Sequence, residues 1–163
     1  MGEREWVVDS EESFMACYQM TVDDVFRYAG VLCGADRAAA EDATQEAYFS
    51  LLRRVHTGQV TSVTAAYLRL SVRHRFLDEV KRRSRDERRV ELAASVDSTP
   101  SNATDFSLLA DLSDRERAAV VLRYVDDLPV AGVGKAMDIS TRAAESLLAR
   151  ATRRLRGDGD HRA

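Results

Sequence analysis

Residues 64–89 read TAAYLRLSVRHRFLDEVKRRSRDERR, and this stretch decides the fold. Leu68, Val72, Phe76 and Val80 recur four residues apart, so at about 100° per residue they share one face of a helix. The opposite face carries one ring, hydrogen-bonding groups and cations: Tyr67, Ser71, His74, Asp78, Lys81, Arg82 and Arg85. The stretch therefore predicts one long helix that turns an apolar face to a core and a polar face outward.

The outward face suits an unstacked nucleic-acid strand, because a ring stacks on a base while donors reach its edge and cations meet the phosphates. A solvated helix face with one tyrosine at its rim is the alternative, because charge runs are usually solvated. The distribution of charge favours nucleic acid. Residues 69–89 hold nine Arg or Lys against four Asp or Glu, and residues 142–156 hold five against one, although the net charge is −3. Such segregation indicates separate surfaces for separate partners.

The composition indicates an all-α protein of the cytoplasm. Only two prolines occur in 163 residues, and 45% of the residues are apolar. No apolar run approaches the roughly 18–20 residues of a membrane span, and the acidic start MGEREWVVDS is unlike a signal peptide. Cys17 and Cys33 lie sixteen residues apart without a CxxC motif, which favours buried free thiols over a disulfide or metal site. We expect no cofactor.

Helical periodicity extends to the N-terminal side of the long helix. Residues 1–11 show no pattern and are expected to form a loose tail, with docking of Trp6 on the fold as the alternative. A helix is expected over 12–33, ended by Gly34. A second helix over 38–56 places Phe49 in the middle of its polar face. An aromatic residue there is either tucked under a neighbouring element or held out for a partner protein. Residues 57–63, TGQVTSV, predict a polar loop.

The character of the chain changes after Arg85. Residues 95–102, SVDSTPSN, lack periodicity and contain one of the two prolines, which favours a flexible linker. We therefore expect two small helical domains, over 12–90 and 105–158, with residues 91–104 between them.

The C-terminal part has the pattern of a helix-turn-helix. Ser113-Asp114-Arg115-Glu116 is a capping box that begins a helix. A short helix over 129–137, weakened by Gly132 and Gly134, and a basic helix capped by Ser140 follow. The last helix of such a unit enters the major groove of DNA by its N-terminal residues. A three-helix bundle that does not bind DNA has the same pattern, but the arginines favour DNA.

Three stretches resemble the bacterial sigma factors of RNA polymerase. The first stretch, residues 40–54, reads AEDATQEAYFSLLRR. It resembles a sigma-factor motif in which an acidic residue is followed, after two residues, by Gln-Glu or Gln-Asp and then by an apolar-aromatic run. The second stretch, residues 67–83, reads YLRLSVRHRFLDEVKRR and resembles the promoter-melting helix that follows this motif in the family. The third stretch, residues 112–156, resembles the family's C-terminal helix-turn-helix. The stretches occur in the family's order and leave no room for the segments that larger members carry. The chain is thus similar to the extracytoplasmic-function class, group IV.

The resemblance implies a role for three sets of residues. The motif that docks on a coiled coil of the polymerase β′ subunit matches Asp42, Gln45 and Glu46, with Phe49 and Arg53 beside them. The helix that holds the −10 element, together with its surroundings, carries Tyr67, Ser71, His74, Asp78, Lys81, Arg82 and Arg85. The helix that reads the −35 element carries Ser140, Thr141, Arg142, Glu145, Ser146, Arg150 and Arg154. The linker is expected to pass through the polymerase near the nascent RNA.

Two departures from the family's pattern bear on DNA contacts. His74 stands where asparagine is common, and Glu145 stands where a basic residue is frequent. A glutamate loses a phosphate contact there but accepts a hydrogen bond from the amino group of cytosine.

The expected function is that of a promoter-specificity subunit whose partners are core polymerase (β′ and β), promoter DNA and, in many relatives, an anti-sigma protein. An enzyme is not expected, because His74 and Asp78 are joined by no further ligand or nucleophile. The alternative is a stand-alone helix-turn-helix regulator, which would form a stable homodimer on a palindromic site, whereas a sigma factor would be a monomer that ignores DNA until polymerase is added.

Overall fold

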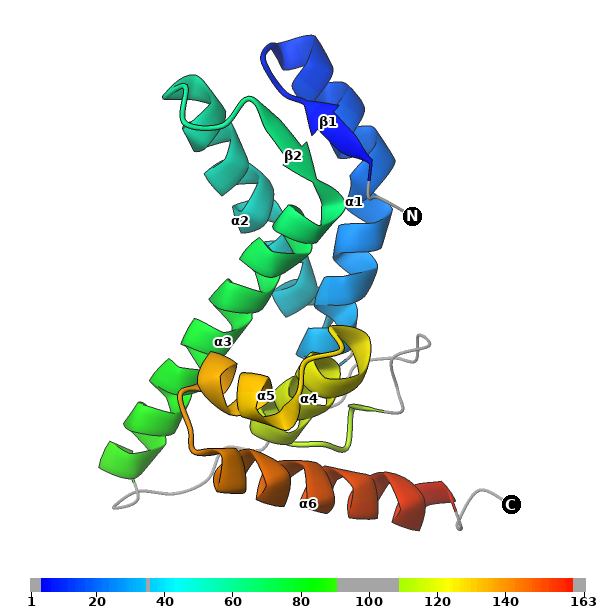
Figure 1. Ribbon diagram of the computed structural model, residues 1–163, viewed down its shortest axis with the longest axis vertical. Helices are drawn as coiled ribbons and strands as arrows, with labels where there is room; N and C mark the ends of the chain where they lie inside the picture. Colours follow the sequence, from blue (N-terminus) through cyan, green and yellow to red (C-terminus); the bar gives the residue numbers. More distant parts are fainter. Residues whose placement is uncertain (1–3, 35, 91–108, 160–163) are drawn as a thin grey trace.

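The computed structural model describes residues 4–34, 36–90 and 109–159 (Figure 1). The elements along the chain are β1 (Glu5–Val7), α1 (Glu11–Cys33), α2 (Arg37–His56), β2 (Ser62–Thr64), α3 (Ala65–Val90), α4 (Asp114–Val120), the π-helical turn η2 (Val121–Val125), α5 (Val130–Met137) and α6 (Thr141–Gly159). The predicted helical fold is confirmed, and α1, α2, α3 and α5 lie within one residue of the ranges expected for them. The predicted linker, 91–104, lies outside the described residues.

The expected loose tail is wrong for residues 5–7. These residues form β1, which pairs antiparallel with β2 in the register Glu5↔Thr64, Trp6↔Val63 and Val7↔Ser62. The second strand occupies the end of the segment that was expected to be a polar loop. Val8 and Val63 are buried in the core, so apolar burial holds together two segments that lie far apart in the chain.

Local sequence signals begin and end the helices where they were expected. Ser10 accepts a hydrogen bond from the backbone of Ser13 at the start of α1, and Gly34 ends that helix in the left-handed conformation with φ 60°. Asp36 accepts from the Ala39 N–H at the start of α2, at 3.0 Å. Ser113 and Glu116 form the predicted capping box at the start of α4.

The first core lies between α1, α2 and α3. Leu68 and Val72 of α3 are fully buried there, as the fourfold spacing predicts, together with Leu32 of α1 and Leu51 of α2. Leu70, which lies beside that apolar face on the helix, is exposed. The long helix α3 extends beyond the other two helices, as Figure 1 shows.

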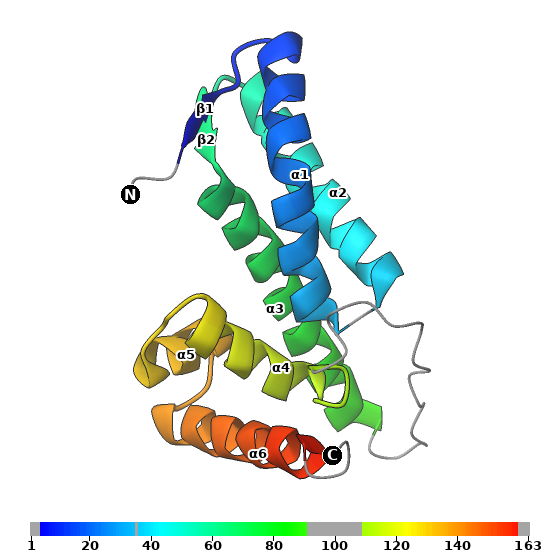
Figure 2. The ribbon, with the colours of Figure 1, turned by 90° about the vertical axis from the view of Figure 1, so that its right-hand side faces the viewer.

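The second core packs the C-terminal helices and the far end of α3. Leu77 of α3 belongs to the same buried cluster as Leu112, Val133 and Leu147, whereas Val121 of η2 belongs to the first core. In both ribbon views, α4 and α5 lie between α6 and the N-terminal bundle (Figures 1 and 2). The two helical units are therefore in direct contact. In the parts of the chain that are described, no helix is long and apolar enough to cross a membrane.

Candidate functional site

The polar face of α3 lies on the outside of the N-terminal bundle. His74, Asp78, Arg82 and Arg85 are exposed, whereas Tyr67, Ser71 and Lys81 are half-buried. The Ser71 hydroxyl donates to the backbone carbonyl of Tyr67, at 3.0 Å. The seven residues predicted to hold an opened strand therefore share one continuous helix, with the ring nearest its start and the cations nearest its end.

Part of the positive charge on this face is balanced within α3. Arg82 donates two hydrogen bonds to Glu79, at 3.0 and 2.8 Å, and Arg83 donates a third, at 2.9 Å. These bonds lower the pKa of Glu79 to about 2, so its carboxylate stays ionised at neutral pH. Arg82 thus reaches a phosphate only in competition with Glu79.

Arg54 of α2 joins this face, although helical spacing in the sequence does not predict it. Its Nη1 donates to the Tyr67 hydroxyl, and its guanidinium carbon lies 5.6 Å from the centre of that ring. The Thr64 hydroxyl, at the end of β2, accepts from the backbone N–H of Tyr67, at 3.2 Å. The Arg54 side chain of α2 therefore holds the ring, and the Thr64 hydroxyl satisfies a backbone N–H in the first turn of α3. The sequence shows two adjacent arginines, Arg53 and Arg54, but it does not tell which of them contacts Tyr67 of α3.

The polar side of α2 forms a separate surface. Asp42, Gln45 and Arg53 are exposed, and Glu46 accepts a hydrogen bond from Arg53 at 2.9 Å, which lowers the pKa of Glu46. Phe49 has 56% of its area exposed, so of the two alternatives for this ring the structure shows it held out rather than tucked under a neighbour. An exposed ring among charged groups is typical of a protein interface.

The outward side of α6 presents most of its predicted residues to solvent. Ser140, Thr141, Arg142, Glu145, Ser146 and Arg150 are exposed along the first half of the helix, and Leu147 packs in the core. Arg154 differs, because it donates to the buried carboxylate of Glu116 at 2.9 Å. Its guanidinium helps to hold α6 on α4 and is less available to DNA.

Gly134, expected to weaken the helix-turn-helix, is instead required by it. A Cβ atom at Gly134 would lie 2.9 Å from the carbonyl oxygen of Ile139, closer than real Cβ atoms come. Asp138 takes the left-handed conformation at the end of α5, with φ 58°. The glycine therefore lets the turn pass close to α5 and sets the start of α6.

The two cysteines are free thiols. Cys17 is buried and Cys33 is half-buried. Burial is the main cause that raises the pKa of Cys33 to about 12, with a smaller contribution from the nearby charge of Asp36. Among the described residues, no group of three or more His, Cys, Asp or Glu side chains is arranged to hold a metal ion.

Family models match both helical units. Residues 17–86 match the model described as "Sigma-70 region 2", and residues 108–157 match "Sigma-70, region 4". The matched ranges contain nearly all the α2, α3 and α6 residues considered above. No curated protein matches the chain.

Among solved structures, the chain is similar to one titled "Co-crystal structure of the sigma factor RpoE in complex with the anti-sigma factor NepR from Bartonella quintana". The two chains are 19% identical, with a TM-score of 0.52, over 90% of this chain and 96% of that one. At this identity the likeness shows a shared fold.

Proposed function

Because the chain belongs to the sigma-70 family, in its extracytoplasmic-function class, we propose that three surfaces divide the work of promoter recognition among them. A sigma factor directs RNA polymerase to promoters by recognising the −35 element and by opening and capturing the −10 element, and it catalyses no reaction. RNA polymerase and promoter DNA are the partners that the family implies. Since that polymerase works in the cytoplasm, we place the chain there.

The first surface is the polar side of α2, which we assign to the coiled coil of the β′ subunit. This assignment is supported by the exposed Phe49, which is flanked by polar groups: Asp42, Gln45 and the Arg53–Glu46 ion pair. Exposed rings at the centre of a polar patch contribute most of the binding free energy in many interfaces. Phe49→Ala should therefore weaken the capture of core polymerase more than any change at the rim of the patch.

The second surface is the polar face of α3 together with Arg54, which we assign to the opened strand of the −10 element. Opening a duplex costs a few kcal/mol per unpaired base, and stacking of a captured base on a ring returns roughly 1–3 kcal/mol. Tyr67 supplies the ring, Arg54 supplies a cation against it, and Lys81 and Arg85 supply charge further along the helix. This ring-and-cation pair, on residues matched by region 2, is the observation that carries the proposal.

The third surface is the start of α6, which we assign to duplex DNA of the −35 element. Ser140, Thr141 and Arg142 stand at its N-terminal end, where hydroxyl and guanidinium donors reach phosphates and base edges. Glu145, one turn further, accepts from the amino group of a cytosine if it faces the bases.

Run-off transcription tests the proposed function directly. Purified core polymerase is incubated with genomic fragments, with and without the chain, and the transcripts are mapped. We expect discrete start sites that depend on the chain, and no binding of the same fragments by the chain alone. A homodimer that binds these fragments without polymerase would instead support a stand-alone regulator.

An anti-sigma protein is a further proposed partner. The sigma factor in the similar solved structure is in complex with the anti-sigma factor NepR. Such a protein would act here by covering the α2 or α3 surface, and a pull-down with the full chain, followed by competition with core polymerase, tests this.

A further inference from the structure

The start of α3 depends on the strand that precedes it. Thr64, the last residue of β2, lies directly before Ala65, and its hydroxyl accepts the backbone N–H of Tyr67 at 3.2 Å. The first four N–H groups of a helix have no carbonyl partner within it, so a side chain that accepts from one of them stabilises the first turn. Thr64 therefore holds the turn of α3 that carries the Tyr67 ring.

The strand β2 is held in turn by β1. Beyond the three paired residues, the backbone N–H of Val8 donates to the carbonyl of Thr61 at 2.9 Å. The Ser62 hydroxyl also donates to Oε1 of Glu5, at 2.5 Å. Within the part of the chain that the structure describes, β1 and β2 form a two-stranded sheet, which is marginally stable unless it packs on a core. The position of β2 therefore depends on how firmly residues 5–8 are anchored.

Alternate side chains anchor these residues. Val8 is fully buried, and Trp6 is half-buried and packs against the same core as Tyr67. The guanidinium carbon of Arg4 lies 4.0 Å from the centre of the Trp6 ring, a cation–π contact. Val7, between the two anchors, is 58% exposed. Successive side chains of a strand point to opposite sides, so Trp6 and Val8 anchor the strand while Val7 faces outward.

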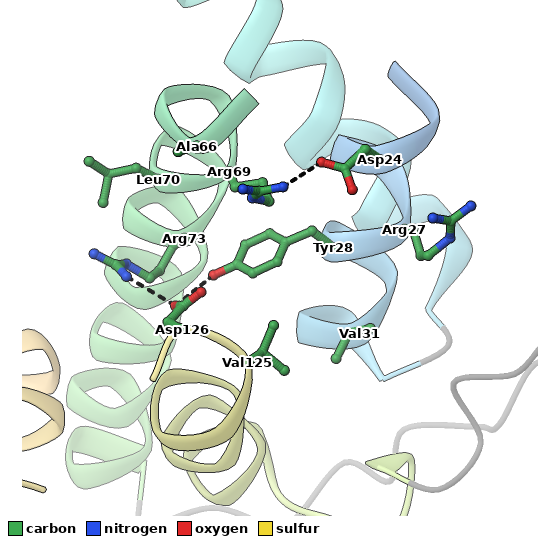
Figure 3. A pocket seen from close by; sticks show the side chains of 10 residues that line it. All are labelled: Asp24, Arg27, Tyr28, Val31, Ala66, Arg69, Leu70, Arg73, Val125 and Asp126. Carbon is green, nitrogen blue, oxygen red and sulfur yellow. Dashed lines mark hydrogen bonds and ion pairs between the residues drawn. The ribbon is translucent and has the colours of Figure 1, made fainter. Parts of the chain in front are cut away.

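Two helices hold the sides of α3 near its start. Arg69 donates to Asp24 of α1 at 2.6 Å, and Figure 3 shows these two side chains pointing toward each other from α3 and α1. On α2, Arg54 donates to the Tyr67 hydroxyl. The sheet adds a third contact, because β1 ends only a few residues before α1 begins at Glu11 and so joins the start of α1 to the start of α3.

Tyr67 is the member of the proposed −10 surface that depends most on this sheet. Helix ends fray, and Tyr67 lies in the first turn of α3, whereas the other members, from Ser71 to Arg85, lie further along the helix. A ring that is already in place when a base arrives loses less conformational freedom on binding, so the base is captured more readily.

We propose that residues 5–8 are a positioning segment for the −10 surface: by pairing with β2 they hold Thr64 and the first turn of α3, so that the Tyr67 ring is in place before a base is captured. The segment acts through Tyr67 and not by touching DNA. It lies ahead of the range matched by region 2, residues 17–86. The inference rests on the proposed function, because it takes the α3 face as the surface for the opened strand.

Trp6→Ala tests the segment, because it removes one of the two anchors of β1. The holoenzyme is assayed on a promoter found by run-off transcription, with permanganate reactivity as the measure of opening. We expect opening to fall about 2- to 10-fold, the effect of a ring that must be ordered on binding. Capture of core polymerase and recruitment to duplex DNA should not change. Val7→Ala is the matched control in the same strand and should open promoters like the parent.

Thr64 gives a second test, at the residue that links β2 to α3. Thr64→Val keeps the branched shape but removes the hydroxyl that accepts from Tyr67, so opening should fall in the same range. Thr64→Ser keeps the hydroxyl and should open promoters like the parent. Circular dichroism checks that each variant is folded, and the Thr64 pair decides the question if Trp6→Ala does not fold.

A double-mutant cycle separates positioning from a general loss of stability. If residues 5–8 act through the ring, Trp6→Ala or Thr64→Val should reduce opening no further once Tyr67→Ala is present. The proposal is overturned if these reductions multiply, or if folded Trp6→Ala or Thr64→Val opens promoters like the parent. Loss of opening with Tyr67→Ala alone would then leave the proposed function intact, whereas normal opening with Tyr67→Ala would contradict the assignment of the α3 face itself.

Discussion

The Tyr28 hydroxyl donates to a carboxylate oxygen of Asp126 across 98 residues of sequence, at 2.9 Å. Burial first, and then the negative charge of Asp126, raise the pKa of Tyr28 well above its ordinary value. The phenol therefore stays protonated, and continues to donate, at neutral pH. One hydrogen bond thus joins α1, in the N-terminal unit, to Asp126, which follows η2 in the C-terminal unit.

Tyr28→Phe should lower the free energy of unfolding by about 1–2 kcal/mol, because it removes one hydrogen bond to a charged acceptor and keeps the ring. Urea unfolding of the full chain measures this. Tyr124→Phe is the control, since Tyr124 is 66% exposed, and it should leave the midpoint unchanged. Equal effects of the two changes would show that the bond to Asp126 contributes nothing.

Gly34→Ala should lower the free energy of unfolding by more than the ordinary cost of placing an alanine at a positive φ. An alanine with positive φ costs about 1–2 kcal/mol, and at Gly34 its methyl group also displaces the Arg117 guanidinium. Gly58→Ala is matched to it, because Gly58 has φ 68° and open space around it. The difference in unfolding free energy between the two variants measures the Arg117 contact, and a difference of zero would contradict it.

Glu79 should make the stability depend on pH in the acid range. Its hydrogen bonds from Arg82 and Arg83 lower its pKa in the folded protein to about 2, below its ordinary value of 4.5. The contribution of Glu79 to the free energy of unfolding is therefore fully present above pH 4.5 and is lost as the pH falls through about 2. Thermal midpoints recorded across this range should fall less steeply for Glu79→Gln than for the parent chain. Parallel curves would mean that the bonds to Glu79 do not stabilise the fold.

Arg54→Ala should reduce promoter opening by the holoenzyme about 5- to 150-fold, the effect of losing roughly 1–3 kcal/mol of stacking support. Arg54→Lys, which keeps the charge but not the planar group, should lie between it and the parent. Arg37 offers a control on the same helix: it lies 5.8 Å from the centre of the Phe26 ring and pairs with Glu41. Arg37→Ala should open promoters normally. Permanganate reactivity of unpaired thymines reports the opening in each case.

The helices were predictable because their signals are local. The fourfold spacing of Leu68 and Val72, the cap at Ser113 and the stop at Gly34 each involve residues within one or two turns of one another. The surfaces were predictable to the same extent, since the outward residues of α2, α3 and α6 follow from helical spacing and from the resemblance.

The contacts between distant segments were not predictable in this way. The pairing of Trp6 with Val63 depends on tertiary packing, and residues 5–7 carry too short an alternation to signal a strand. Arg117 would ordinarily be assigned to the surface, yet it is buried because three carbonyl groups converge on it. Arg54 was missed for the same reason, because its role depends on which ring α3 brings beside it.

The central claim is that the α3 face captures the opened −10 strand while α6 holds the duplex. The most direct measurement is a permanganate footprint of the holoenzyme carrying Tyr67→Ala together with Lys81→Ala, beside a mobility-shift assay on the same promoter. We predict that thymine reactivity in the −10 element is lost while recruitment to the duplex survives. A footprint unchanged from that of the parent protein would contradict the claim.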